Sequence, residues 1–166
     1  MDLDDELDLI LARRDRQDMQ PTIDALLPIL ATHPENPRVL YEVGGAHDTA
    51  GEEAAARDYY EKALVLGLDD DLLMRCYVQY GSTLRNLGEL EESRAVFRRA
   101  RAAFPGSPAL GVFEAITLHA QERPDEAVAS LLELITRFVS APDIERYTAA
   151  ILANAAHIRS TSGLES

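Results

Sequence analysis

The sequence has little cysteine and no long hydrophobic run. Cys76 is the single cysteine, so no disulfide can form within the chain, which fits a reducing compartment. No stretch of about 18 apolar residues runs without interruption, so a membrane-spanning helix is not expected. The acidic first eight residues have neither the basic segment nor the apolar run of a secretory signal. Together these absences predict a cytoplasmic protein that has no membrane partner.

Positive charge is also scarce, because 16 basic residues face 29 acidic ones and the formal net charge is -13. Nucleic-acid binding draws most of its free energy from Lys and Arg side chains that displace counterions from phosphates. Nucleic acid is therefore not an expected partner. Lys62 is the only lysine, and all other basic residues are arginines, whose planar guanidinium can hold a carboxylate through two parallel hydrogen bonds.

The residue types that perform enzymatic chemistry do not form recognisable motifs. His33, His47, His119 and His157 are isolated from one another and from Cys76, so no metal site is expected. The sequence has no glycine-rich phosphate loop and no nucleophile elbow. It therefore predicts no catalytic activity, no cofactor and no metal, and Cys76 is interpreted as a small buried residue on a helix.

What the sequence does contain is a repeated order of small and bulky residues. Five positions recur after 37 residues: Gly44, Gly51, Ala56, Tyr60 and Ala63 return as Gly81, Gly88, Ser93, Phe97 and Ala100. A weaker copy follows 34 residues later at Ala115, Glu122, Ala127, Leu131 and Leu134. A repeat of this length is typical of stacked helical hairpins and not of a globule with one core.

Apolar residues between the turn signals are spaced by three and four, which predicts helices and no strand. The expected helices are residues 4–15, 21–32, 37–50, 53–66, 71–87, 90–103, 108–121, 124–137 and 143–158. Small residues allow two helices to approach closely where they cross. We expect such a crossing between Gly44 and Ala56, with Tyr60 filling the wider gap one turn away.

The repeated residues resemble the signature of the tetratricopeptide repeat, which is a bulky residue, Gly, Gly, Ala, an aromatic residue, Ala and Pro over about 34 residues. The matching positions are Leu40, Gly44, Gly51, Ala56, Tyr60 and Ala63, then Tyr77, Tyr80, Gly81, Gly88, Phe97, Ala100 and Pro105. The third copy departs from the pattern, with Gly111 in place of the bulky residue and Val139 in place of Pro. Residues 37–138 also resemble a family of small bacterial tetratricopeptide proteins.

This resemblance implies an all-α fold, a right-handed α-solenoid of helix-turn-helix repeats with a C-terminal capping helix. The expected organisation is a single domain over residues 1–159. It comprises a degenerate repeat at 3–36, repeats at 37–70, 74–107 and 108–141, and a capping helix at 143–158. A frayed tail is expected at residues 160–166.

In this architecture the first helix of each hairpin lines a concave groove. The expected groove residues are Arg38, Tyr41, Arg75, Val78, Ser82, Arg85, Val112, Ile116 and His119. Three arginines among apolar side chains, in an otherwise acidic chain, favour a peptide or partner helix that carries apolar side chains and a carboxylate. The alternative is that these arginines are solvated or paired with Glu42 and Asp48, and that Val112 and Ile116 belong to the core.

The sequence thus predicts a non-catalytic protein-interaction module that binds a peptide or a partner helix in this groove. The second hypothesis is a structural homodimer. In that case Val78, Val112, Ile116 and the last helix would form an apolar face that associates with a second copy. The resemblance to the small bacterial family also favours a dimer.

Overall fold

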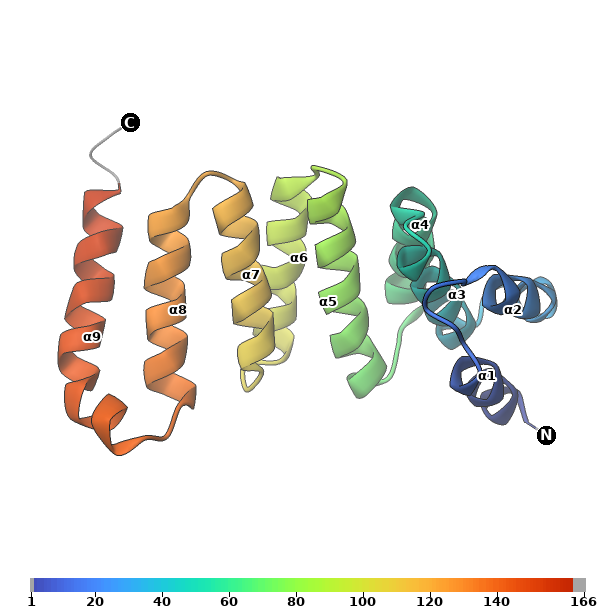
Figure 1. Cartoon of the computed structure of the whole chain (residues 1–166), viewed down its shortest axis with the longest axis horizontal. Coiled ribbons are helices and arrows are strands. Elements are labelled where there is room, and N and C mark those ends of the chain that lie inside the picture. The colour runs from blue at the N-terminus through green and yellow to red at the C-terminus, as the bar shows by residue number, and fades with distance from the viewer. Residues whose placement is uncertain (1, 163–166) are drawn as a thin grey trace. The chain divides into compact units, whose positions relative to one another are not determined.

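Figure 1 shows the computed structural model, which describes residues 2–162. Every regular element in this range is an α-helix, and no strand occurs there apart from an isolated bridge between Asp15 and Asp18. The nine helices are α1 (Leu3–Ala12), α2 (Gln20–Thr32), α3 (Pro37–Thr49), α4 (Glu53–Leu66), α5 (Asp70–Asn86), α6 (Leu90–Ala103), α7 (Pro108–Ala120), α8 (Pro124–Phe138) and α9 (Pro142–Thr161). The predicted all-α fold is confirmed.

The chain forms two compact units, which we call unit one and unit two. Unit one ends at Gly88 and contains α1 to α5, and unit two begins at Glu89 and contains α6 to α9. Gly88 has a φ of 82°, in the left-handed region that glycine enters without a steric penalty. The boundary falls inside the expected repeat 74–107, so that its first helix belongs to unit one and its second to unit two.

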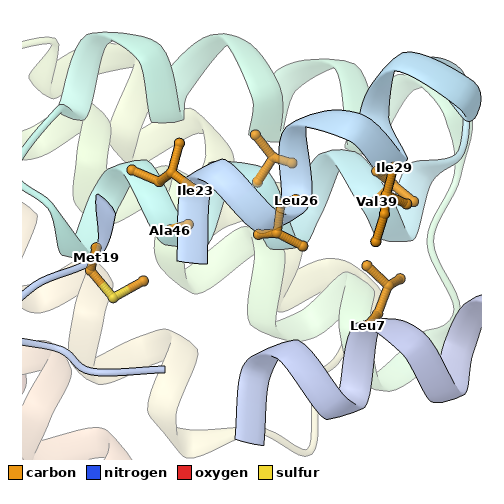
Figure 2. Packing of buried hydrophobic residues seen from close by; sticks show 8 residues of the cluster. Leu7, Met19, Ile23, Leu26, Ile29, Val39 and Ala46 are labelled. Atoms are coloured by element: carbon orange, nitrogen blue, oxygen red, sulfur yellow. The ribbon is translucent and has the colours of Figure 1, made fainter. Parts of the chain in front are cut away.

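The first core of unit one is built by α1, α2 and α3. Figure 2 shows side chains of the three helices gathered in one cluster, among them Leu7 of α1, Leu26 of α2 and Val39 of α3. The cluster consists of Leu7, Met19, Ile23, Leu26, Ile29, Val39, Val43 and Ala46. Leu7 and Leu26 are completely buried, so α1 is held to the hairpin by apolar packing although its outer surface is strongly acidic.

A second core in unit one surrounds the crossing of α3 and α4. Tyr60 and Ala56 are completely buried, and a Cβ atom added to Gly44 would lie only 2.9 Å from Cδ1 of Tyr60. The two helices can therefore approach at this point only because Gly44 has no side chain. This geometry confirms the crossing predicted from Gly44, Ala56 and Tyr60.

Unit two is a series of helices in which α7 packs on α6, α8 on α7 and α9 on α8. Phe97 of α6 is completely buried, and its ring stacks on Phe113 of α7 at a centroid distance of 6.2 Å. The hydroxyl groups of Ser93 and Thr117 form a buried hydrogen bond of 3.0 Å between the same helices. Ala155 is the fully buried contact residue of α9.

The first and last helices end at residues other than those expected. Helix α1 stops at Ala12, three residues early, because Asp15 accepts a hydrogen bond from the backbone N–H of Gln17 and so favours a turn. Helix α9 continues to Thr161, three residues late. Ser160 and Thr161 of the expected tail therefore belong to a helix, and residues 163–166 of that tail lie outside the described residues.

Within residues 2–162, no helix combines the length and the apolar character needed to cross a bilayer.

Candidate functional site

The candidate site is a cavity of about 670 Å³ in unit one. Its walls come from α1, from the connection between α1 and α2, and from α3 and α5. Three of the expected groove residues line it together: Arg38 and Tyr41 on α3 and Arg75 on α5. A volume of this size is within the usual range of ligand pockets.

The residues that line the cavity are mainly basic, whereas unit one as a whole is acidic. Unit one has eight basic and 18 acidic residues in its sequence, yet four arginines and only two acidic residues line the cavity. The lining arginines are Arg14, Arg16, Arg38 and Arg75, and the acidic residues are Asp8 and Glu42. Half of the cations of unit one therefore gather around one cavity.

Arg38 is already neutralised by acidic residues of the same unit. Its Nη1 lies 2.7 Å from Oδ1 of Asp4, its Nη2 donates to Asp8, and its Nε lies 3.9 Å from Oε1 of Glu42. Burial opposes the charged form, but the hydrogen bonds to Asp4 and Asp8 outweigh it, so the pKa of Arg38 is raised. The alternative interpretation, in which an arginine of the groove pairs with Glu42, therefore holds for Arg38.

The other arginines of the cavity are available to a ligand. Arg75 is 61% exposed, and its Nε lies 3.2 Å from Asp71, one turn earlier on the same helix. Such an exposed pair is worth little, so a ligand can replace it at small cost. Among the described residues, Arg14 and Arg16 have no ion-pair partner within 4.0 Å. Three cationic groups can thus contact an incoming anion.

An aromatic side chain, that of Tyr41, also lines the cavity. Tyr41 is 6% exposed, and its ring centroid lies 6.1 Å from that of Tyr60. Burial raises the pKa of Tyr41 to about 12, and the neighbouring Glu42 adds to the effect, so the phenol stays neutral at physiological pH. Burial also raises the pKa of Glu42. The cavity therefore combines a neutral tyrosine side chain with several cationic ones.

The remaining expected groove residues do not line this cavity. Val78, Ser82 and Arg85 lie half-buried on α5. Burial lowers the pKa of Arg85, and its Nη1 atom has no hydrogen-bond partner among the described residues. Val112 and Ile116 lie on α7 of unit two and are 40% and 43% exposed, as is characteristic of surface residues and not of the core. His119 is also exposed on α7, and the role of these six residues stays a prediction.

Sequence reasoning missed Arg14 and Arg16. The expected first helix extended to residue 15, which placed both arginines on a helix or at its end and not in a connection that faces α3 and α5. The available signal was the run Arg13, Arg14, Asp15, Arg16, which is basic within an otherwise acidic N-terminal segment.

Cys76 contributes packing and no reactivity. It is completely buried on α5, and its thiol donates to the backbone carbonyl oxygen of Tyr60 across 3.8 Å. Burial raises the pKa of Cys76 to about 12, so the thiol stays protonated. This confirms the prediction of a small buried residue. Across residues 2–162, no three His, Cys, Asp or Glu side chains come together in an arrangement that could bind a metal ion.

Asp48 joins three helices of unit one beside the site. Its carboxylate accepts hydrogen bonds from the hydroxyl of Tyr60 at 3.3 Å and from that of Thr83 at 3.2 Å, which links α3 to α4 and α5. Burial raises the pKa of Asp48, although these two hydrogen bonds act in the opposite direction. The partners of Asp48 are therefore hydroxyl groups and not the arginines considered from the sequence.

Asp48→Asn is expected to flatten the dependence of stability on pH. Because the pKa of Asp48 is raised by folding, this carboxyl stabilises the fold below its unfolded pKa of about 4, and the contribution is lost as pH rises through the folded pKa. The amide of asparagine does not ionise; its oxygen can still accept one of the two hydrogen bonds, and its NH2 group can donate to the oxygen of the other hydroxyl. Urea unfolding between pH 4 and pH 7 measures the effect. The exposed Asp58→Asn serves as the control, and an unchanged pH dependence in Asp48→Asn would contradict the assignment.

Comparison with known proteins assigns the chain to a family. A family model described as "Tetratrico peptide repeat" matches residues 37–158. No curated protein shows significant sequence similarity to the chain. Among solved structures, one crystal structure of MamA is similar at a TM-score of 0.68 and 17% identity, covering 98% of this chain and 93% of that one.

Two further structures agree with this likeness. A second crystal structure of MamA gives a TM-score of 0.63 at 17% identity and covers 80% of this chain and 67% of that one. A MamA double mutant (RS-1 ArsTM) gives 0.66 at 14% identity, with coverage of 95% and 93%. At these identities the likeness shows the fold alone, and it agrees with the predicted all-α repeat solenoid. Because the family model covers most of the chain, the protein belongs to the tetratricopeptide repeat family.

Proposed function

We propose that this protein is a non-catalytic interaction module whose unit-one cavity binds an acidic segment of a protein partner. Tetratricopeptide proteins are in general protein-interaction modules, which supports the class of function. The observation that carries the specific proposal is the cavity itself, because it collects four arginines beside the buried ring of Tyr41 in an acidic unit. The low cysteine content supports a cytoplasmic setting.

The expected ligand is an extended peptide or a helix that carries a carboxylate next to an apolar side chain. The carboxylate would contact Arg14, Arg16 or Arg75, which have little or no competition from acidic neighbours. The apolar side chain would pack on Tyr41 and on the half-buried Leu72. Arg38 contributes positive potential, but its two Nη groups are taken by Asp4 and Asp8.

Arg14→Gln combined with Arg75→Gln is expected to weaken the binding of acidic peptides by about tenfold or more, because each charge-assisted hydrogen bond contributes about 1.5–3 kcal/mol. The probe is a fluorescently labelled peptide of alternating Leu and Glu with a free carboxyl end, titrated at two salt concentrations and followed by anisotropy. Lys62→Gln on α4 is the matched control, since Lys62 is exposed and lies outside the lining of the cavity. Equal affinity of the double variant and the wild type would refute the assignment.

Self-association is the second candidate, because unit two exposes apolar side chains. Val112 and Ile116 lie one turn apart on α7 and are 40% and 43% exposed, and Tyr147 on α9 is 57% exposed. Exposed apolar groups of this kind favour an interface. Analytical ultracentrifugation at micromolar concentration distinguishes the candidates, since a strictly monomeric species excludes the homodimer.

A further inference from the structure

Unit two has its own cavity, of about 340 Å³, at one end of its helices. The walls are the last turns of α6, the connection from α6 to α7, Glu114 of α7, and the last turns of α8. Phe104, Leu134 and Phe138 provide the apolar part of the lining, and Arg98, Arg101 and Arg137 provide the charged part. Three of the eight basic residues of unit two therefore meet at one small cavity.

A buried carboxylate positions two of these arginines. Glu114 of α7 is 6% exposed, its Oε2 accepts from Nη1 of Arg101 at 2.6 Å, and its Oε1 lies 3.8 Å from Nε of Arg98. A carboxylate is placed this deep only when cations compensate its loss of water. Here it holds the guanidinium of Arg101 by a hydrogen bond and forms a looser ion pair with that of Arg98; the two groups remain 41% and 62% exposed and can still donate to a ligand.

The third arginine is positioned by the backbone and by a ring. Nη2 of Arg137 donates to the carbonyl oxygen of Pro105 at 3.1 Å, and its guanidinium carbon lies 5.0 Å from the centroid of the Phe138 ring. This contact is within the range of a cation–π interaction. Arg137 is therefore held at the cavity by neutral groups, which leave its charge uncompensated.

We propose that this cavity is a binding site for a phosphomonoester that carries an apolar or aromatic group. Three guanidinium groups and one carboxylate leave an excess of two positive charges among the described lining residues. A phosphomonoester has a charge of about -1.5 to -2 at pH 7 and three acceptor oxygens, so it matches this excess better than a carboxylate does. Phe104 and Phe138 would contact the group that carries the phosphate.

This site is separate from the expected groove residues of the same unit. Glu114 lies two residues from both Val112 and Ile116, which places it on the opposite face of α7. Glu114 is buried, whereas Val112 and Ile116 are exposed. The phosphomonoester site also shares no lining residue with the unit-one cavity proposed to bind a peptide, so failure of one proposal leaves the other standing.

The test is an NMR titration of the full ¹⁵N-labelled chain at constant ionic strength with phenyl phosphate, benzoate and an acetylated, amidated phosphotyrosine peptide. Both phosphomonoesters are expected to shift backbone signals near residues 98–107 and 134–138 and to bind about tenfold more tightly than benzoate. Tighter binding of the peptide would assign the phosphate to a protein partner, and tighter binding of phenyl phosphate would assign it to a small molecule. Benzoate binding as tightly as phenyl phosphate would overturn the proposal.

Arg98→Gln combined with Arg137→Gln is expected to weaken phenyl phosphate binding by about tenfold or more. Arg101 is left intact, because its removal would leave the buried Glu114 with a weaker partner and could unfold the unit. The exposed Arg99→Gln on the same helix is the matched control, since Arg99 is not part of the lining. Unchanged affinity in the double variant, or shifts spread over other arginines of the wild type, would also overturn the site.

Discussion

Phe97→Ala is expected to lower the free energy of unfolding of unit two by about 3–5 kcal/mol, the usual loss when a buried aromatic residue is truncated. Phe97 is completely buried and stacks on Phe113, so its removal leaves a cavity between α6 and α7. These two helices are also joined by the hydroxyl pair of Ser93 and Thr117, which limits how far they can move together to fill the cavity. Urea unfolding followed by far-UV circular dichroism measures the loss.

Tyr147→Ala is the matched control for this variant. Tyr147 is an aromatic residue of the same unit, but it is 57% exposed on α9. Its truncation is expected to change the free energy of unfolding by less than about 1 kcal/mol. Similar losses for the two variants would mean that Phe97 does not form the core of unit two.

Gly44→Ala is expected to destabilise unit one by about 2 kcal/mol, although alanine favours a helix over glycine by about 1 kcal/mol. The added Cβ would lie 2.9 Å from Cδ1 of Tyr60 and 3.2 Å from Cβ of Tyr59. Tyr60 is completely buried and the Cβ of Tyr59 is attached to the backbone, so neither can move without shifting α4. The same urea titration measures this loss.

The adjacent glycine provides the control. A Cβ added to Gly45 would meet only the hydroxyl oxygen of Tyr60, at an ordinary distance of 3.7 Å. Gly45→Ala is therefore expected to be neutral or to stabilise the helix by up to about 1 kcal/mol. A loss in Gly45→Ala as large as that in Gly44→Ala would show that the effect comes from helix α3 in general and not from the crossing.

The helices and the first crossing could be predicted from the sequence, because both depend on local spacing. Turn residues and apolar steps of three and four determine where helices begin and end, and the order Gly44, Ala56, Tyr60 specifies which faces meet. The third repeat was harder because one packed pair of residues exchanges its sizes. In the repeat at 37–70, the bulky Leu40 is on α3 and the small Ala63 is on α4. In the third repeat the order is reversed. There the small residue is Gly111 on α7, and a Cβ added to it would lie 2.7 Å from Cδ1 of Leu134 on α8.

The contents of the candidate site could be predicted only in part. Arg38, Tyr41 and Arg75 follow from helix periodicity within repeats that match the family pattern. The pairing of Arg38 with Asp4 and Asp8 depends on where α1 folds back, and the degenerate first hairpin lacks the small residues that would have indicated its packing. Arg14 and Arg16 were missed for the same reason. Contacts between distant segments of a degenerate repeat leave no periodic signal.

The position of the unit boundary decides how the chain should be divided for separate expression. A fragment cut between the expected repeats, after residue 70, would lose α5 and with it Leu72, Arg75 and Gln79 of the unit-one cavity. A fragment that ends at Gly88 keeps the whole lining and finishes on a residue already suited to a chain reversal. The fragment that keeps its cavity intact therefore comprises the first two expected repeats and helix α5.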